Sequence, residues 1–258
     1  MKKEGRSCMS GLLKEDVAIV TGSSRGIGRS TALAFAEQGA NLVIHGTQIE
    51  ALEEVCAEIR ALGSRCEYVA GDIGEYATAE RLAKTAMETY GKIDVLVNNA
   101  GVNSRHSFQE ITPTEWDRML QINLTSAFYT CKCVVPFMMQ RKSGKIINMS
   151  SSAGKTAHPN ASVCYGVSKA GINSLTQKLA YDLAPYGIRV NAVCPGPIET
   201  DMTKQWSPEY RKEIYNTIPI HRIGKSEDVA NVAVFLASEM SAFIIGESIN
   251  VNGGKYMN

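Results

Sequence analysis

Asp16-Val-Ala-Ile-Val-Thr21-Gly22-Ser23-Ser24-Arg25-Gly26-Ile27-Gly28 is the stretch of the sequence that decides the fold. Its first six residues are almost all apolar, which is typical of a strand buried on both faces of a parallel sheet. Glycines follow at once, and apolar residues at helical spacing then continue as far as Gly39. A strand, a glycine turn and a helix in this order predict a dinucleotide-binding βαβ unit, because glycines let the backbone approach a pyrophosphate at the helix N-terminus.

The rest of the chain continues this alternation. We expect further strands at 41–46, 65–72, 93–97, 145–150, 188–193 and 248–252, and helices at 48–62, from about 75, over 112–141, after 165 and over 226–236. With no linker or repeat, this order predicts an α/β protein: a single-domain Rossmann fold whose doubly wound parallel sheet of about seven strands carries helices on both faces. We expect 1–12 to be a disordered tail, 13–258 to be the domain and 195–225 to be a substrate lid.

Length and composition exclude several classes of protein. The chain has 258 residues, 44% of them hydrophobic, which suffices for a full core. A net charge of +1 from scattered basic residues argues against a nucleic-acid partner, and the absence of a long apolar run argues against a membrane span or a secretory signal. Seven cysteines without framework spacing and four scattered histidines indicate a reduced, cytoplasmic protein without a metal site.

The end of the second expected strand bears on the choice of cofactor. An acidic residue there would bind the ribose 2′-hydroxyl of NAD(H) and repel the 2′-phosphate of NADP(H). This chain has His45-Gly46-Thr47 instead, and it carries basic Arg25 in the glycine turn. Both observations favour NADP(H), while NAD(H) stays open.

Two later strands end in polar residues that point to the same ligand. Asp72-Ile73 follows the third strand, where the carboxylate could bond the adenine amino group or cap the next helix. Asn98-Asn99-Ala100-Gly101 follows the fourth strand, and its carboxamides could pin strand ends while the small residues leave room for a flat cofactor. The rigid turn that starts at Cys194-Pro195-Gly196 lies at the carboxyl end of the sixth strand, where ligands bind in such sheets.

Tyr165 and Lys169 are the candidate chemical groups. They stand four residues apart in a helical pattern, so the phenol and the ammonium share one helix face. A nearby cation lowers the pKa of a phenol and suits it to exchange a proton with a carbonyl or alcohol oxygen. Asn123 is a polar residue among apolar neighbours, and it could equally satisfy a buried backbone group, with a bend in its helix.

These motifs together resemble the short-chain dehydrogenase/reductase family, from about residue 16 to the C-terminus. Six motifs carry the resemblance, in the family's order and spacing: Thr21-Gly-Ser-Ser-Arg-Gly-Ile-Gly28, Asn98-Asn-Ala-Gly101, Asn123, the serine run 150–152, Tyr165-x-x-x-Lys169 and Pro195-Gly196. The resemblance implies a Rossmann fold, a nicotinamide cofactor, hydride transfer between it and a carbonyl or secondary alcohol, and a homotetramer.

The resemblance also implies a role for each residue of the site. Tyr165 is the acid/base, Lys169 lowers the pKa of the phenol and bonds the nicotinamide ribose, a serine holds the substrate oxygen, and Asn123 anchors a proton-relay water. The residues matched to cofactor contacts are Gly22, Ser24, Arg25, Gly26, Ile27, Gly28, Thr47, Asp72, Ile73, Asn99, Ala100, Gly101, Tyr165, Lys169, Pro195, Gly196, Ile198 and Thr200.

The identity of the catalytic serine depends on the way it is counted. The family pattern Asn-x-Ser-Ser-x-x-Gly aligns with residues 148–154 and selects Ser151. Counting back from Tyr165 by the family's usual interval selects Ser152 instead. We favour Ser151, because strand register decides which side chain faces the pocket.

Two branches of the family compete for the substrate. Residues 198–203 and 250–257 resemble 3-oxoacyl-[acyl-carrier-protein] reductases, in which basic residues near the pocket hold the acidic carrier protein. Lys142 matches one of these positions, but Tyr181 stands at the other. Residues 101–108 resemble gluconate 5-dehydrogenases, in which a basic loop could meet a sugar carboxylate. Here Arg105 would do so, or the Arg105–His106 pair would simply face solvent. Hydroxysteroids and other small ketones stay open, as does a non-enzymatic NADP(H) sensor.

Overall fold

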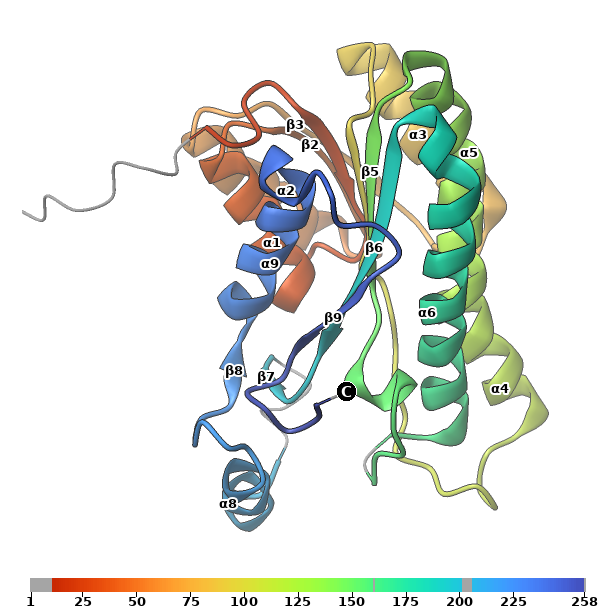
Figure 1. Cartoon of the computed structure of the whole chain (residues 1–258), viewed down its shortest axis with the longest axis vertical. Coiled ribbons are helices and arrows are strands. Elements are labelled where there is room, and N and C mark those ends of the chain that lie inside the picture. The colour runs from red at the N-terminus through yellow and green to blue at the C-terminus, as the bar shows by residue number, and fades with distance from the viewer. Residues whose placement is uncertain (1–10, 160, 201–205, 258) are drawn as a thin grey trace, which may run out of the picture.

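The computed structural model describes residues 11–159, 161–200 and 206–257, and within them strands and helices alternate (Figure 1). The strands are β1 (Val17–Val20), β2 (Asn41–Gly46), β3 (Cys66–Ala70), β4 (Val95–Asn98), β5 (Gly144–Met149), β6 (Ile188–Pro195), β7 (Ile198–Glu199), β8 (Gly224–Lys225) and β9 (Ser248–Val251). The α-helices are α1 (Gly26–Glu37), α2 (Ile49–Ala61), α3 (Tyr76–Tyr90), α4 (Pro113–Leu120), α5 (Ser126–Arg141), α6 (Val163–Leu183), α8 (Pro208–Asn216) and α9 (Ser226–Ala237).

Seven of these described strands form one parallel sheet in the order β3-β2-β1-β4-β5-β6-β9. The chain winds outward from β1 in one direction and from β4 in the other. β1 and β4 are neighbours, with Ala18 opposite Val95, so the strand order reverses between them. This confirms the predicted doubly wound Rossmann fold, and ligands bind at the carboxyl ends of the strands at such a reversal.

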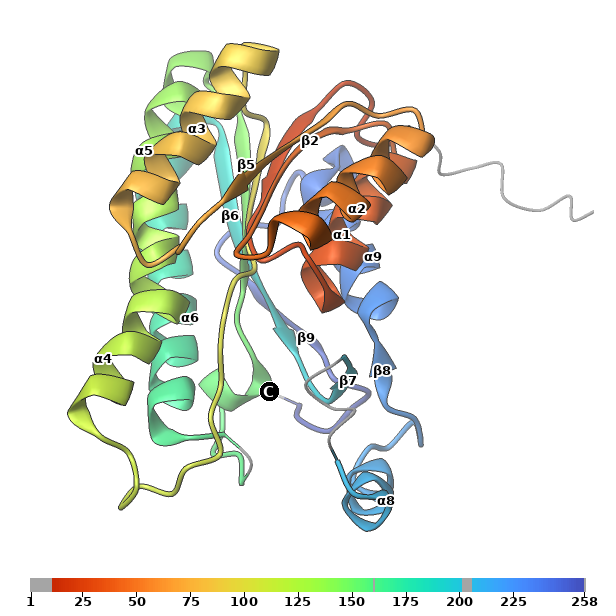
Figure 2. The same cartoon turned by 180° about the vertical axis from the view of Figure 1, so that it is seen from behind.

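A separate hydrophobic core covers each face of the sheet. One core contains Phe35 of α1, Leu52 of α2 and Val229 of α9, and the other contains Leu82 of α3 and Met138 of α5 with the end of α6. Figures 1 and 2 show these two helical layers on opposite sides of the strands. Because most strand residues are buried on both faces, the ligand-accessible polar groups are expected at the strand ends.

The structure departs from the predicted elements in two places. The helix expected over 112–141 is divided by a π-helical segment, Gln121–Thr125, between α4 and α5. Within the expected lid, β7 pairs with β8 in a small second sheet that the sequence did not predict. Residues 201–205 of that lid and 1–10 of the expected tail lie outside the described residues, whereas Leu12 already packs against the core and donates its N–H to Gln38 Oε1 at 3.3 Å.

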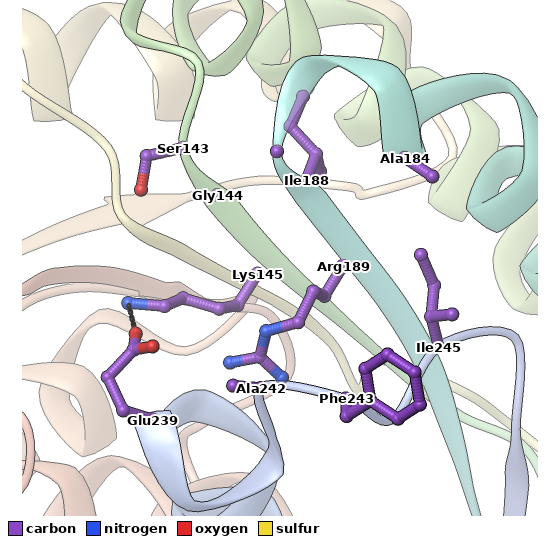
Figure 3. A pocket seen from close by; sticks show the side chains of 11 residues that line it. Ser143, Gly144, Lys145, Ala184, Ile188, Arg189, Glu239, Ala242, Phe243 and Ile245 are labelled. Atoms are coloured by element: carbon purple, nitrogen blue, oxygen red, sulfur yellow. Dashed lines mark ion pairs between the residues drawn. The ribbon is translucent and has the colours of Figure 1, made fainter.

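A cavity of about 500 Å³ lies where β5 and β6 begin (Figure 3). This end of the parallel strands, the amino edge of the sheet, is opposite to the carboxyl edge, where the strands end. Its charged side chains are engaged in structural contacts. Arg189 donates to the carbonyl oxygens of Leu236 and Ser238 at the end of α9, at 3.2 and 2.9 Å. Lys145 lies 3.5 Å from both Asp16 and Glu239. These contacts hold the amino edge together.

No described helix is long and apolar enough to cross a membrane.

Asp94 is the central ion-pair residue of this amino edge. Its carboxylate accepts from Val17 N at 2.8 Å and pairs with Lys92 at 2.9 Å and Arg141 at 2.8 Å, and the residue is only 5% exposed. Burial alone would raise the pKa of Asp94, but the partners outweigh burial and lower the pKa below its ordinary value.

We expect Asp94→Asn to lower the free energy of unfolding by about 1–3 kcal/mol at pH 7, because hydrogen bonds to a charged group are lost. A carboxylate with a depressed pKa stabilises the fold above its unfolded pKa, and this stabilisation disappears as the pH falls through the folded pKa. The difference between wild type and variant should therefore shrink below about pH 4. Denaturant unfolding measures it, with Asp182→Asn in the exposed Lys178–Asp182 pair as control. Equal losses in the two variants would contradict this.

Candidate active site

The glycine turn after β1 packs directly on the end of β4. Gly22 has a φ of +66°, and a Cβ added to it would lie 2.8 Å from the Cα of Ala100. A Cβ added to Gly28 would overlap the carbonyl oxygen of Gly22. Both positions therefore exclude side chains, and the turn presents bare backbone at the reversal of the sheet.

Asn99 fastens this turn to β4. Its side-chain amide donates to the carbonyl oxygens of Thr21 at 2.9 Å and Gly22 at 3.0 Å. In return, Thr21 Oγ1 accepts from the backbone N–H groups of Asn99 and Ala100 at 3.0 and 3.1 Å. The Asn-Asn pair thus ties strand ends together, as its position in the sequence predicts. The Asn98 side-chain amide also joins two strands, because its Nδ2 donates to Asn148 Oδ1 of β5 at 2.9 Å.

The N-terminus of α1 opens next to this turn. Arg25 occupies the N-cap position without a side-chain cap bond, so the first N–H groups of the helix are left for a ligand. A Cβ on Gly26 would lie 3.6 Å from the methyl group of Thr200, so the segment after β7 lies against the turn, beside Ile198 of that strand. A helix N-terminus beside bare glycine backbone fits a pyrophosphate, and these residues therefore fit a dinucleotide.

The expected adenosine end is formed by the ends of β2 and β3. Thr47 is exposed and Ile73 is buried. Asp72 accepts from Gly74 N at 2.9 Å and pairs with Arg118 of α4 at 2.6 Å. Burial would raise the pKa of Asp72, but these partners outweigh it and lower the pKa. The alternative that Asp72 caps the next helix is wrong, since the N-cap of α3 is Glu75.

Tyr165 and Lys169 lie in the first two turns of α6. Ser162 begins the helix, and its hydroxyl accepts from Tyr165 N at 3.3 Å. Lys169 is only 4% exposed, and its ammonium donates to the Met149 carbonyl oxygen at 2.7 Å, 5.7 Å from the centre of the Tyr165 ring. Gly101, at the end of β4, lies beside this ammonium, because a Cβ added there would be 3.4 Å from it.

The pKa shifts of the pair differ from the sequence-based expectation. Burial raises the pKa of Tyr165 above its ordinary value, against the lowering that we expected from Lys169. Burial also lowers the pKa of Lys169, to about 8. The expectation is wrong because both groups are withdrawn from water, which disfavours the charged form of each. At pH 7 the structure therefore holds a neutral phenol beside a charged ammonium.

The serine run separates Ser151 from Ser152. The Ser151 hydroxyl is hydrogen-bonded to Tyr165, which offsets part of the pKa rise that burial causes, and it also accepts from Ala153 N at 3.1 Å. Ser152 begins a short 3₁₀ turn (Ser152–Gly154) and is 4% exposed. Strand register thus brings Ser151 to the phenol.

Asn123 lies in the π-helical segment and faces the end of β4. Its amide forms two bonds with the backbone of Val102, accepting from the N–H and donating to the carbonyl oxygen, each at 2.8 Å. It also donates to Ser168 Oγ at 3.1 Å. Asn123 therefore bonds the backbone of Val102 from a distorted helix, and the same bonds place it beside Gly101 and the Lys169 ammonium.

Comparison with known proteins agrees with this geometry. The family model described as enoyl-(acyl carrier protein) reductase matches residues 22–255. The chain belongs to the short-chain dehydrogenase/reductase family. The 3-oxoacyl-[acyl-carrier-protein] reductase FabG of Staphylococcus aureus is 39% identical over 241 residues, 93% of this chain and 98% of the relative.

Two solved structures extend the comparison. A 3-oxoacyl-[acyl-carrier protein] reductase from Brucella melitensis with bound NAD superposes with a TM-score of 0.90 at 35% identity, covering 100% of this chain and 99% of that one. A putative gluconate dehydrogenase from Agrobacterium tumefaciens gives 0.91 at 34% identity, covering 95% and 98%. This reductase-family chain is an oxidoreductase that uses a nicotinamide cofactor and acts on a carbonyl or CH–OH group.

The branch-specific residues are widely separated in this family member. Arg105 and His106 point to different partners: His106 pairs with Glu115 at 2.8 Å, whereas the charge of Arg105 acts on Tyr210 of α8 and opposes the pKa rise that burial causes there. Tyr181 is sixteen residues beyond Tyr165 on α6, or about 24 Å along the helix. Lys142 ends α5 just before β5 begins, at the amino edge of the sheet. Within one chain, Lys142 and the position of Tyr181 therefore do not lie near Tyr165, contrary to our expectation that they lie near the pocket.

Sequence reasoning missed some residues of this site. Ser150 Oγ donates to the Lys169 carbonyl oxygen at 2.9 Å, and Ser168 Oγ donates to that of Tyr165 at 2.8 Å. His45, which we considered only as a non-acidic residue, is buried among the ends of β1, β2 and β3. A polar residue inside an apolar strand is a signal that could have identified it.

The lowered pKa of Lys169 leads to a pH prediction. The pH profile of kcat/KM reports the ionisable groups of the free enzyme. For carbonyl reduction, kcat/KM should fall above about pH 8, as the ammonium loses its proton while Tyr165 keeps its own. Initial rates between pH 6 and 9.5 measure this, and a profile that stays flat to pH 9.5 would contradict it.

Proposed function

We propose that this enzyme reduces the 3-oxo group of an acyl thioester with NADPH. The observation that carries the proposal is the Ser151–Tyr165 hydroxyl pair beside the buried Lys169 ammonium, at the edge of the sheet where the glycine turn opens. Two hydroxyl groups side by side suit one carbonyl oxygen, which accepts two hydrogen bonds. This chemistry fits a 3-oxoacyl substrate better than the carbon–carbon double bond of an enoyl substrate.

Each residue has a role in this reaction. The bound cofactor supplies the hydride. Ser151 holds the substrate oxygen, and Tyr165 gives that oxygen its proton as negative charge develops on it. Lys169 stabilises the resulting phenolate by its charge and offers its remaining N–H groups to the nicotinamide ribose. Asn123 holds the end of β4 in place next to the ammonium and anchors a water that returns the proton.

The cofactor would lie across the glycine turn with its adenosine end between Thr47 and Asp72. NADP(H) is the preferred form in this proposal. Arg25 is exposed at that turn and forms no ion pair with any described residue, and the first acid after β2 is Glu50 inside α2. A guanidinium without an acidic competitor suits a 2′-phosphate. NAD(H), which is bound in the Brucella relative, is the alternative.

An acyl carrier protein is the proposed donor of the substrate, on the strength of the 39% identical relatives, although Lys142 and Tyr181 lie far from this chain's own site. A homotetramer is the proposed assembly, since exposed Phe128 on α5, Tyr181 on α6 and Phe243 before β9 leave apolar surface for partners. The cytoplasm is the proposed location, in keeping with six described cysteines that are free thiols.

Replacement of Tyr165 tests the proposal. Tyr165→Phe should lower kcat for NADPH oxidation with acetoacetyl thioester by at least about 100-fold, because the proton donor is lost. The affinity for NADPH should stay within about threefold, since the ring remains. Absorbance of NADPH gives the rate and its fluorescence the affinity, with exposed Tyr181→Phe as control. Full activity in Tyr165→Phe, or no oxidation of NADPH by wild type, would refute the proposal.

A sugar-acid dehydrogenase is the second candidate, and the nearness of the Arg105 charge to Tyr210 of α8, in the segment expected to form the substrate lid, favours it. A guanidinium there could bind the carboxylate of 5-ketogluconate. If so, Arg105→Ala should raise KM for 5-ketogluconate by about tenfold or more and leave KM for a neutral ketone unchanged. His106→Ala on the same loop is the control. Equal KM values in Arg105→Ala and wild type would exclude this role.

A further inference from the structure

His45 occupies an unusual place for a polar side chain. It is the fifth residue of β2, 2% exposed, at the point where the carboxyl ends of three strands meet. Its Nδ1 accepts from the N–H of Gly22, after β1, at 3.3 Å. Its Nε2 lies 3.1 Å from the carbonyl oxygen of Gly71, after β3. One imidazole ring therefore links the glycine turn to the segment that leads into Asp72 and Ile73.

The two partners define the state of the ring. A backbone N–H can only donate and a carbonyl oxygen can only accept, so Nδ1 must be bare and Nε2 must carry the proton. The electrostatic environment agrees, because burial lowers the pKa of His45 to about 4. The Gly71 bond and Asp72 oppose this shift, and Arg81 of α3 adds to it. The ring is therefore neutral at physiological pH.

The backbone around His45 reinforces the link. Ser23 N donates to the His45 carbonyl oxygen at 2.8 Å, and His45 N donates to Ser23 Oγ at 3.1 Å. On the other side, Gly71 N donates to the Gly46 carbonyl oxygen at 3.0 Å. The imidazole adds a bond to the N–H of Gly22, the glycine whose φ of +66° starts the turn and whose carbonyl oxygen is bonded by Asn99.

We propose that His45 is a positioning residue for the cofactor, holding the glycine turn and the Asp72–Ile73 segment at the separation that one dinucleotide spans. The inference rests on the proposed binding of cofactor at these two segments. His45 does not touch the reacting atoms. It holds in place the backbone segments that would contact the pyrophosphate and the adenine. Cofactor binding then does not include the entropic cost of ordering these segments.

Three replacements separate the two bonds of the ring. In His45→Asn, Oδ1 can replace Nδ1 as the acceptor for Gly22 N–H, and in His45→Gln, Nε2 can replace the donor to Gly71. His45→Leu keeps neither bond. A lost hydrogen bond that leaves a buried partner unsatisfied corresponds to roughly 10-fold or more in binding. We expect the Kd for NADPH to rise about 10- to 100-fold in His45→Leu and about threefold in His45→Asn, with kcat at saturating cofactor within about twofold.

NADPH fluorescence titration measures these Kd values, and the melting temperature of each variant reports its fold. Equal Kd values for wild type and His45→Leu would overturn the proposal. If His45→Leu does not fold, the comparison of Asn with Gln decides: tighter binding in His45→Asn supports the role of the Gly22 bond, and tighter binding in His45→Gln refutes it. Failure of the proposed function is distinct, since it would appear as NADPH binding without turnover.

A pH measurement tests the neutral ring independently of binding. A histidine whose folded pKa is depressed binds its proton only in the unfolded chain, so stability falls as the pH drops from about 6.5 towards 4. Wild type should therefore lose more melting temperature between pH 7 and pH 5 than His45→Asn does. The charged groups that face the ring, Asp72 and Arg81, are the same in both proteins. Identical losses would overturn the assignment of a neutral, doubly bonded ring.

Discussion

The burial of the Lys169 ammonium is the constraint on which the site depends. Withdrawal of a cation from water is costly, and among the described residues no carboxylate pairs with this one. A single backbone carbonyl, that of Met149, accepts from it directly. This cost appears in the pKa of Lys169, which burial lowers to about 8. Any negative charge that forms nearby would stabilise the buried ammonium. In the proposed reaction, a phenolate at Tyr165 would be such a charge. The burial that raises the pKa of the phenol before reaction would then also strengthen the ion pair.

Three elements from distant parts of the chain create this environment. β5 supplies the Met149 carbonyl and leads into Ser151, α6 supplies Tyr165 and Lys169, and the π-helical segment supplies Asn123. Asn123 lies within the π-helical segment, and its amide forms two bonds with the backbone of Val102. The π-helical distortion has a local cost, and these two bonds offset part of it.

The sequence predicted the parts of this arrangement that are local. The apolar run 17–20, the glycines at 22 and 28 and the spacing of Tyr165 and Lys169 each follow from the conformation of a few consecutive residues. The features that the sequence could not predict depend on contacts between distant segments. They are the pairing of β7 with β8, the ion pair of Asp72 with Arg118, and the hydrogen bonds of His45 to the segments after β1 and β3. The predicted direction of the Tyr165 pKa shift was wrong for the same reason. Sequence spacing determines the distance between Tyr165 and Lys169, but not how far both groups are removed from water.

The two edges of the sheet show a division of tasks that follows from its parallel construction. At the amino edge, Asp94 pairs with two cations and accepts from a backbone N–H, and Arg189 donates to carbonyl oxygens at the end of α9, so these charged groups have partners within the chain. At the carboxyl edge, the N-terminus of α1 has no side-chain cap, and among the described residues no carboxylate pairs with Lys169. Positive potential is therefore left at this edge, and it suits an anionic dinucleotide. The paired charges of the amino edge therefore stabilise the fold, and the helix terminus and ammonium of the carboxyl edge are left for the ligand of the proposed function.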